Sequence, residues 1–279
     1  MGQLVPWNKT SLEIGDVPVA IISLSDARGR RNTLRKRGFS PELVNNFWPA
    51  CDMRVVADTE LRNYSQYNDI KAIYNRSPIP AELGCLFSHS QIIRWLSEQD
   101  IVSQVVIFED DVIPTTRKSL EVLCKLTEFL EPFARDDKPY VCHLGPRPDQ
   151  WRSVFTRKIV KKNGFSVSDI DLYELVDKKS RIWRAHAYVI SKKAADRYVE
   201  MFSRTGFLAD DWRLIADRTG SKMILSDPPL FTQDEDVVST IDPGNNRLLI
   251  DQLKSSNQDS DLANGMKIST LGRGMLRIL

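Results

Sequence analysis

The hydrophobic positions of the chain alternate between short apolar runs and longer segments with helical spacing. Runs rich in β-branched residues predict buried strands, because such strands are apolar on both faces. The predicted strands cover residues 17–24, 104–108, 140–144, 182–190 and 222–225, and residues 47–51 favour extended structure. Strands that alternate with helical segments predict an α/β fold with a largely parallel sheet.

The strongest predicted helix runs from Ala81 to about Glu98, after Pro80, with Leu83 and Leu86 on its apolar stripe. Other helices are predicted at residues 28–37, 117–130 and 192–202, with short helices beginning near residues 41 and 212. We expect Ser25 or Asp26 to cap the helix at residues 28–37 and Ser191 to cap the helix at residues 192–202.

Two segments lack this alternation. Residues 147–180 carry many charges and little periodicity, which predicts a long insertion with one hairpin. Residues 246–279 are rich in Ser, Asn, Asp and Gly and are interpreted as a C-terminal tail. The remaining pattern predicts a single domain over residues 1–245.

Composition narrows the class of protein. Of 279 residues, 42% are hydrophobic, and 39 Lys plus Arg nearly balance 37 Asp plus Glu, which gives no reason to expect nucleic-acid binding. No apolar run approaches the roughly 20 residues of a membrane span, and the N-terminus lacks the pattern of a signal peptide. The four cysteines form no CxxC pair, so reduced thiols in the cytoplasm are the better interpretation.

The sharpest chemical feature is the acidic triplet Glu109-Asp110-Asp111, directly after a predicted strand. In α/β sheets, ligands bind beyond the carboxyl ends of the strands. Alternation along extended backbone places Glu109 and Asp111 on one side and Asp110 on the other. Two carboxylates on one side can hold Mg²⁺ or Mn²⁺ and through it a diphosphate. Solvated acids at the start of a loop are the alternative.

Two weaker features accompany the triplet. Glu82, Cys85 and His89 share one face of the strongest helix, and a polar site there competes with an ordinary helix surface. The basic run 28–37 can meet phosphates in its first turn, although most of it is expected to be a solvated helix face.

Taken in order, these motifs resemble glycosyltransferase family 25, which contains lipooligosaccharide galactosyl- and glucosyltransferases and collagen galactosyltransferases. The matching segments are Ile-Ile-Ser-Leu24 with Arg30-Arg31, Trp48-Pro-Ala50, Ala81-Glu-Leu-Gly-Cys-Leu-Phe-Ser-His89, Val106-Ile-Phe-Glu-Asp-Asp-Val112, His186-Ala-Tyr-Val-Ile-Ser191 and Asp211. The sequence departs from the family pattern at Ser23, at Gly29 and in the insertion.

The resemblance implies a GT-A type, Rossmann-like sheet flanked by helices, which binds a UDP-sugar with Mn²⁺ or Mg²⁺. Glu109 and Asp111 would then hold the metal. The residues expected to contact the nucleotide sugar are Leu24, Ser25, Arg30, Arg31, Glu82, His89, Glu109 and Asp110.

The resemblance also implies inverting transfer, in which a carboxylate deprotonates the acceptor hydroxyl. Asp210 and Asp211 both open a predicted helix, and one of them is expected to be its N-cap. The family position favours Asp211 as the base, with Trp212 as a platform for a sugar ring. A base away from the metal is favoured because a cation lowers the proton affinity of its ligands.

The leading hypothesis is therefore transfer of galactose or glucose from UDP to an oligosaccharide or glycolipid acceptor in lipooligosaccharide or lipopolysaccharide synthesis. A metal-dependent phosphohydrolase and a catalytically inactive binding protein are the alternatives. Residues 266–279 mix Lys267, Arg273 and Arg277 with apolar residues, so peripheral contact with the cytoplasmic face of the inner membrane competes with a disordered end.

Overall fold

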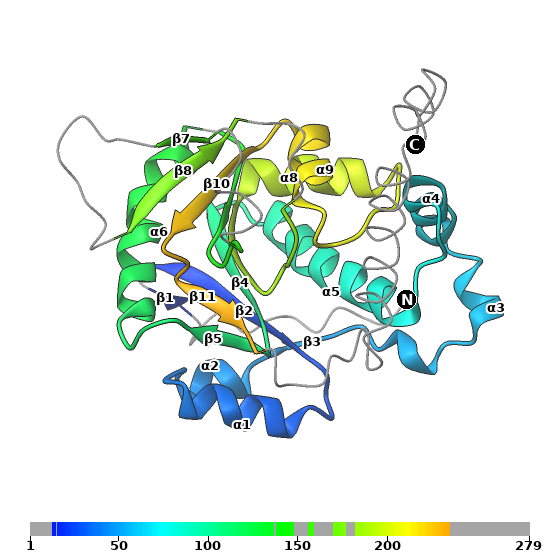
Figure 1. Ribbon diagram of the computed structural model, residues 1–279, viewed down its shortest axis with the longest axis horizontal. Coiled ribbons are helices and arrows are strands. Elements are labelled where there is room, and N and C mark those ends of the chain that lie inside the picture. The colour runs from blue at the N-terminus through cyan, green and yellow to red at the C-terminus, as the bar shows by residue number, and fades with distance from the viewer. Residues whose placement is uncertain are drawn as a thin grey trace, which may run out of the picture. The chain divides into compact units, whose positions relative to one another are not determined.

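A mixed sheet forms the centre of the protein, and the predicted apolar runs supply its middle strands (Figure 1). The computed structural model describes residues 13–14, 16–136, 138–147, 156–158, 170–176 and 182–234. Within these residues, nine strands pair in the order β1-β2-β4-β9-β6-β10-β8-β7, with β3 beside β2. The strands are β1 Glu13–Ile14, β2 Val17–Ser23, β3 Trp48–Pro49, β4 Gln104–Glu109, β6 Tyr140–His143, β7 Thr156–Lys158, β8 Asp171–Leu175, β9 Ala187–Ser191 and β10 Lys222–Asp227.

Most of the central strands point the same way. β3 and β4 run parallel to β2, and β10 runs parallel to β6, while β9 is antiparallel to both β4 and β6. Ile22 of β2 lies opposite Glu109 of β4, so these two strands end at the same edge of the sheet. The predicted α/β class, a Rossmann-like and mostly parallel sheet flanked by helices, is confirmed.

Helices cover both faces of the sheet. They are α1 Arg28–Lys36, α2 Pro41–Asn45, the 3₁₀ turn η1 Met53–Val55, α3 Asp58–Leu61, α4 Ser65–Tyr74, α5 Pro80–Ser97, α6 Ser119–Arg135, α8 Lys192–Phe202 and α9 Trp212–Thr219. Side chains of β4 alternate between two hydrophobic cores. Val105 and Ile107 pack toward α5 and α8, whereas Val106 and Phe108 pack toward α1, α2 and α6. This alternation decides where the acidic residues after β4 point.

One local prediction is confirmed and two are wrong. Ser191 caps α8 as expected, since its side chain accepts from Ala194 N at 3.3 Å. Neither Ser25 nor Asp26 caps α1: the N-cap position is Ala27, without a side-chain hydrogen bond. The strand predicted at 182–190 begins only at Ala187, after a positive φ of 84° at Arg184.

The sequence pattern did not reveal a small second sheet. β5 (Val112–Pro114) follows the acidic triplet and pairs antiparallel with β11 (Phe231–Gln233). The predicted hairpin within the insertion is present as β7 and β8, and β8 adds antiparallel to β10. Among the described residues, no helix has both the length and the apolar character to cross a bilayer. The tail at 246–279 lies outside the described residues.

Candidate active site at the carboxyl ends of the strands

Glu109 ends β4 and is held by two residues of α5. His89 Nε2 lies 3.0 Å from Glu109 Oε1, and the Cys85 thiol donates to the same oxygen at 3.6 Å. On the other side of the ring, Tyr188 OH lies 2.8 Å from His89 Nδ1. An ionised carboxylate can only accept, so the consistent tautomer has Nε2–H donating to Glu109 and Nδ1 accepting from Tyr188. This chain of hydrogen bonds orients the carboxylate.

The hydrogen bonds also keep Glu109 ionised. Burial by itself raises the pKa of this carboxyl, but the hydrogen bond from His89 and the nearby imidazoles outweigh burial and lower the pKa below its ordinary value. His89 is 2% exposed, and its position four residues after Cys85 places both side chains on one face of α5. The predicted shared face of Cys85 and His89 is therefore confirmed, and it faces Glu109.

Asp111 is the second carboxylate of this edge. Its Oδ2 accepts from Gln233 Nε2 of β11 at 2.9 Å. Its Oδ1 is buried and has no hydrogen-bond partner among the described residues. Burial and then the charge of Glu109 raise the pKa of Asp111 to about 7. A buried oxygen without a partner next to an ionised carboxylate leaves negative charge to be compensated.

The donor set of this edge fits a divalent cation in two ways. Carboxylate oxygens of Glu109 and Asp111 are ligands that Mg²⁺ or Mn²⁺ prefers. Cys85, His89 and Glu109 also place one ligand atom each within 4.8 Å of one another, a set suited to a softer metal. The partnerless Oδ1 of Asp111 favours the oxygen set, because in the second set the thiol and the imidazole already donate to Glu109.

Asp110 points to the opposite face of the sheet, as alternation predicts. Ser23 Oγ donates to it at 2.7 Å and Arg30 Nη1 lies 2.9 Å away. Arg31 donates to Ser23 Oγ at 2.9 Å, and its guanidinium also reaches the carbonyl oxygens of Leu24 and Ser25. These expected nucleotide contacts thus hold one another and fix the loop after β2. Their contact with a nucleotide stays a prediction.

Glu82 contacts residues beside the start of α5, and its expected contact with the nucleotide sugar stays a prediction. Its carboxylate receives two hydrogen bonds from Arg76, at 2.7 and 2.6 Å, and one from Ile79 N at 3.1 Å. The side chain is 4% exposed and stabilises the first turn of α5, because the first backbone N–H groups of a helix lack partners within the helix. The spacing of Glu82 and Cys85 matches one helix face, but Glu82 lies in the first turn of α5, where its carboxylate accepts from Ile79 N and pairs with Arg76.

Asp211, not Asp210, is the N-cap of α9. Asp211 Oδ1 accepts from Leu214 N at 3.2 Å, and Oδ2 accepts from Tyr74 OH at 2.9 Å. Asp211 is 4% exposed and both of its oxygens accept hydrogen bonds, while its expected role as the base stays a prediction. One of the two acids was expected to be the cap, and it is Asp211, because Asp211 directly precedes Trp212, the first residue of the helix.

The charge of Asp210 acts on a residue of the acidic edge. Burial, followed by the charge of Glu109 and then that of Asp210, raises the pKa of the Cys85 thiol. Asp210 is half-buried. Trp212, expected as a sugar platform, is instead 1% exposed, and its Nε1 donates to the Arg184 carbonyl at 2.6 Å. Its ring belongs to the core because α9 packs its first turn against the sheet.

Three residues of the site were missed in the sequence. Tyr188 and Gln233 come from elements whose pairing with β4 or β5 the sequence does not show. Arg184 adopts a positive φ, and its carbonyl accepts from His143 Nε2 at 2.7 Å as well as from Trp212. A backbone conformation that side chains rarely adopt is a structural signal of a functional region, and it leaves no trace in periodicity.

Comparisons with known proteins agree with the resemblance. The model of glycosyltransferase family 25, described as an LPS biosynthesis protein, matches residues 17–212. None of the curated proteins compared with the chain matches it. A crystal structure of apo UDP-glucose pyrophosphorylase has a TM-score of 0.32 and 12% identity, over 77% of this chain and 80% of that one. A likeness that weak has no bearing on mechanism.

Proposed function

Because this chain belongs to glycosyltransferase family 25, we propose that it transfers a hexose, galactose or glucose, from a UDP-sugar to a saccharide acceptor with inversion and with the help of a divalent cation. The acceptor is an oligosaccharide or glycolipid of lipopolysaccharide or lipooligosaccharide synthesis. The family supports glycosyl transfer in lipopolysaccharide synthesis. The sugar, the metal and the stereochemistry are the finer parts of the proposal.

One observation supports a metal-dependent reaction. At the end of β4, an ionised Glu109 stands beside Asp111, whose buried Oδ1 lacks a partner among the described residues. Mn²⁺ or Mg²⁺ held by Glu109 and Asp111 would neutralise the diphosphate of the donor. His89 and Cys85 hold one oxygen of Glu109, so the carboxylate does not have to be ordered when the donor binds.

The acceptor hydroxyl needs a base that is distinct from these carboxylates. Both oxygens of Asp211 already accept hydrogen bonds, so a proton on Asp211 would compete with the donor at Leu214 N or with that at Tyr74 OH. Asp210 is half-buried, and its charge reaches the Cys85 side of the site. We therefore assign the proton of the acceptor hydroxyl to Asp210 rather than to Asp211, which the sequence favoured. Such assistance typically contributes about 10²–10⁴ in rate.

The phosphohydrolase alternative finds less support. A two-metal hydrolytic site commonly draws on several histidines. Of the three histidines in the chain, only His89 contacts Glu109 within the described residues. His143 donates to the Arg184 carbonyl and accepts from Gly145 N, and burial lowers its pKa to about 3. An inactive binding protein stays open to test, although the acidic pair is present.

The test is a panel of UDP-sugars in which UDP release is measured with and without Mn²⁺ and an oligosaccharide acceptor. Release that needs both metal and acceptor supports the transferase. Phosphate release from unrelated esters supports the hydrolase. Titration of UDP with and without Mn²⁺ then separates an active enzyme from an inert module, because a protein without a donor site has no reason to prefer UDP.

A further inference from the structure

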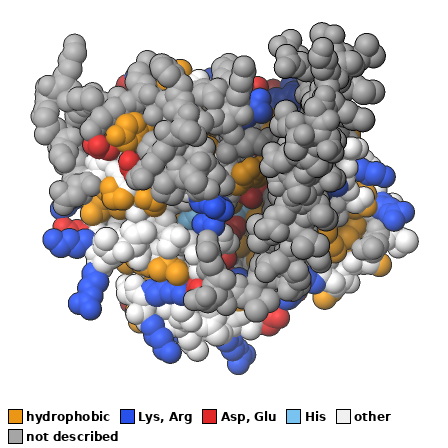
Figure 2. Space-filling view, in the orientation of Figure 1, with side chains coloured by type: hydrophobic (Ala, Val, Ile, Leu, Met, Phe, Trp, Pro, Cys, Tyr) orange, Lys and Arg blue, Asp and Glu red, His pale blue; other side chains and the backbone are white. Residues whose placement is uncertain are grey.

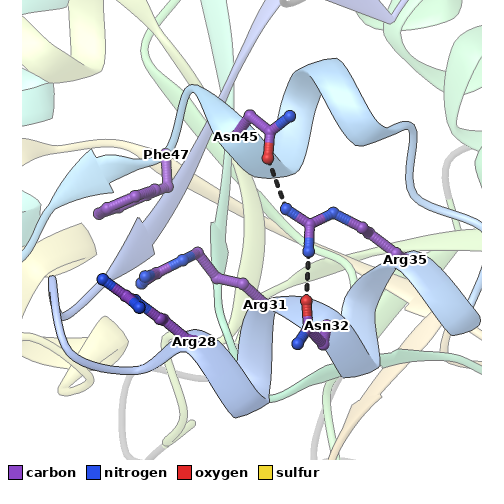
Figure 3. Close-up of a pocket in the computed structure, with 6 residues that line it drawn as sticks. All are labelled: Arg28, Arg31, Asn32, Arg35, Asn45 and Phe47. Carbon is purple, nitrogen blue, oxygen red and sulfur yellow. Dashed lines mark hydrogen bonds between the residues drawn. The ribbon is translucent and has the colours of Figure 1, made fainter.

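A pocket lined by basic residues lies between α1 and the segment that follows α2, apart from the Glu109 side of the sheet. Its volume is about 300 Å³, and its lining residues are Arg28, Arg31, Asn32, Arg35, Asn45 and Phe47 (Figure 3). The space-filling view shows Lys and Arg side chains along the lower edge of the molecule, where Figure 1 places α1 (Figure 2). Among the described residues, no carboxylate lines this pocket.

The positive charge of the pocket is not neutralised by described residues. Arg30 of the same helix pairs with Asp110, and Arg37, directly after the helix, pairs with Asp234. In contrast, Arg28, Arg31 and Arg35 form no ion pair within the described part of the chain. Arg28 and Arg31 project to the same side, past the ring of Phe47 (Figure 3). Two guanidinium groups held side by side repel each other unless an anion lies between them.

The lining groups are held in place. The Arg31 guanidinium lies 4.0 Å from the centre of the Phe47 ring and donates to Ser25 O at 2.9 Å. Arg35 reaches across from α1 and donates to the side-chain oxygens of both Asn32 and Asn45. Because those amide oxygens accept from Arg35, the amide N–H groups are left as further donors. The pocket therefore offers almost only donors, and Arg31 and Arg35 are held before any ligand arrives, which suits a phosphate group.

We propose that this pocket holds the phosphate group of a phosphorylated saccharide acceptor. Identification of the ligand as the acceptor rests on the proposed transferase function, whereas phosphate binding does not. The pocket borders the strand ends, since Arg31 donates to Ser23 Oγ, which donates to Asp110. The donor diphosphate is assigned to the metal carboxylates on the other face. Three arginines need no metal to bind an anion, so the two sites differ in metal dependence.

The first experiment measures binding of glucose 6-phosphate in EDTA by calorimetry, with glucose as the uncharged control. The phosphate ester is expected to bind and glucose is not. Arg28→Ala and Arg35→Ala are each expected to weaken binding about tenfold, because each removes a charge-assisted contact. Lys36→Ala removes one charge from the same helix outside the pocket and is expected to bind like the wild type.

Equal affinity of wild type, Arg28→Ala and Arg35→Ala would overturn the proposal, as would an equal loss in Lys36→Ala. Inorganic phosphate that binds as tightly as the sugar phosphate would overturn the saccharide part. In the transfer assay, Arg28→Ala is expected to raise KM for a phosphorylated acceptor about tenfold and to leave KM for the UDP-sugar unchanged. A raised KM for the donor alone would overturn the assignment to the acceptor. If no transfer is found, the binding experiment in EDTA still shows whether the pocket binds a phosphate group.

Discussion

His89 donates from Nε2 to Glu109 Oε1 across 3.0 Å, while Tyr188 OH donates to Nδ1 of the same ring across 2.8 Å. The three side chains come from α5, β4 and β9, so one hydrogen-bonded chain joins a helix to two neighbouring strands. A buried carboxylate without such a donor would gain a proton rather than stay charged. The relationship therefore links the architecture of the sheet to the charge at its edge.

His89→Ala is expected to raise the pKa of Glu109 and to weaken Mn²⁺ binding about ten- to a hundredfold, since it removes the donor that orients the carboxylate. His89→Gln is the matched variant, because its amide can donate to Glu109. Mn²⁺ titration of the transfer reaction at pH 7 compares the metal affinity of the two variants. An alanine variant with unchanged Mn²⁺ affinity would show that His89 only packs the core.

Asp111→Asn is expected to lower metal-dependent transfer by roughly a hundredfold or more, because it removes a charged ligand oxygen and keeps the volume of the side chain. Circular dichroism and thermal unfolding check that the fold is intact. The control is Asp217→Asn, an exposed acid on α9. Normal activity with unaltered Mn²⁺ dependence in Asp111→Asn would remove Asp111 from the metal site.

The raised pKa of Asp111 predicts how stability depends on pH in EDTA. Its folded pKa of about 7 exceeds the unfolded value of about 3.9, so the folded state binds more protons between these values. The free energy of unfolding contributed by this group therefore falls as pH rises from about 4 to about 7. Asp111→Asn should show a smaller fall over this window, measured by urea unfolding. Identical pH profiles for both proteins would contradict the assigned pKa.

Substitution of Asp210 is expected to lower turnover, whereas substitution of Asp211 is expected to lower stability. Asp210→Asn should lower kcat about a hundredfold or more with UDP affinity and stability near wild type. Asp211→Asn should lower the free energy of unfolding by about 1–2 kcal/mol, because it weakens the cap of α9 and the bond from Tyr74. Tyr74→Phe serves as the control for that bond. A large loss of kcat confined to Asp211→Asn would restore the sequence-based assignment.

Glu82→Ala is expected to act on folding and not on the donor. It leaves the half-buried Arg76 guanidinium without its bidentate partner and Ile79 N without an acceptor, which should cost about 2 kcal/mol or more. Thermal unfolding measures this loss, and UDP titration of the folded protein should give the wild-type affinity. A stable variant with weakened UDP binding would place Glu82 in the donor site after all.

Membrane contact through residues 262–279 stays a prediction outside the described residues. Its measure is co-sedimentation with anionic and with neutral liposomes, for the full chain and for a chain that ends at residue 261. The full chain should bind anionic liposomes more strongly, because Lys267, Arg273 and Arg277 favour an anionic surface. Equal binding of both chains would exclude the tail as the contact.

The sequence alone determined the α/β class and the order of the central strands along the chain, because apolar periodicity reflects which side chains are buried. It also determined that Glu109 and Asp110 face opposite sides, since alternation along a strand is a local property. The shared face of Cys85 and His89 follows in the same way from helical spacing. These features depend only on neighbours in the chain.

Only the tertiary structure decided which residues from distant parts of the chain contact the site residues. Tyr188 and Gln233 reach the site through strand pairings that join distant segments, and local patterns do not encode which segments meet. The same limit explains Glu82, Asp211 and the basic pocket. Whether an acid caps a helix or serves a site, and whether three arginines of one helix face solvent or surround a cavity, depends on what packs against them.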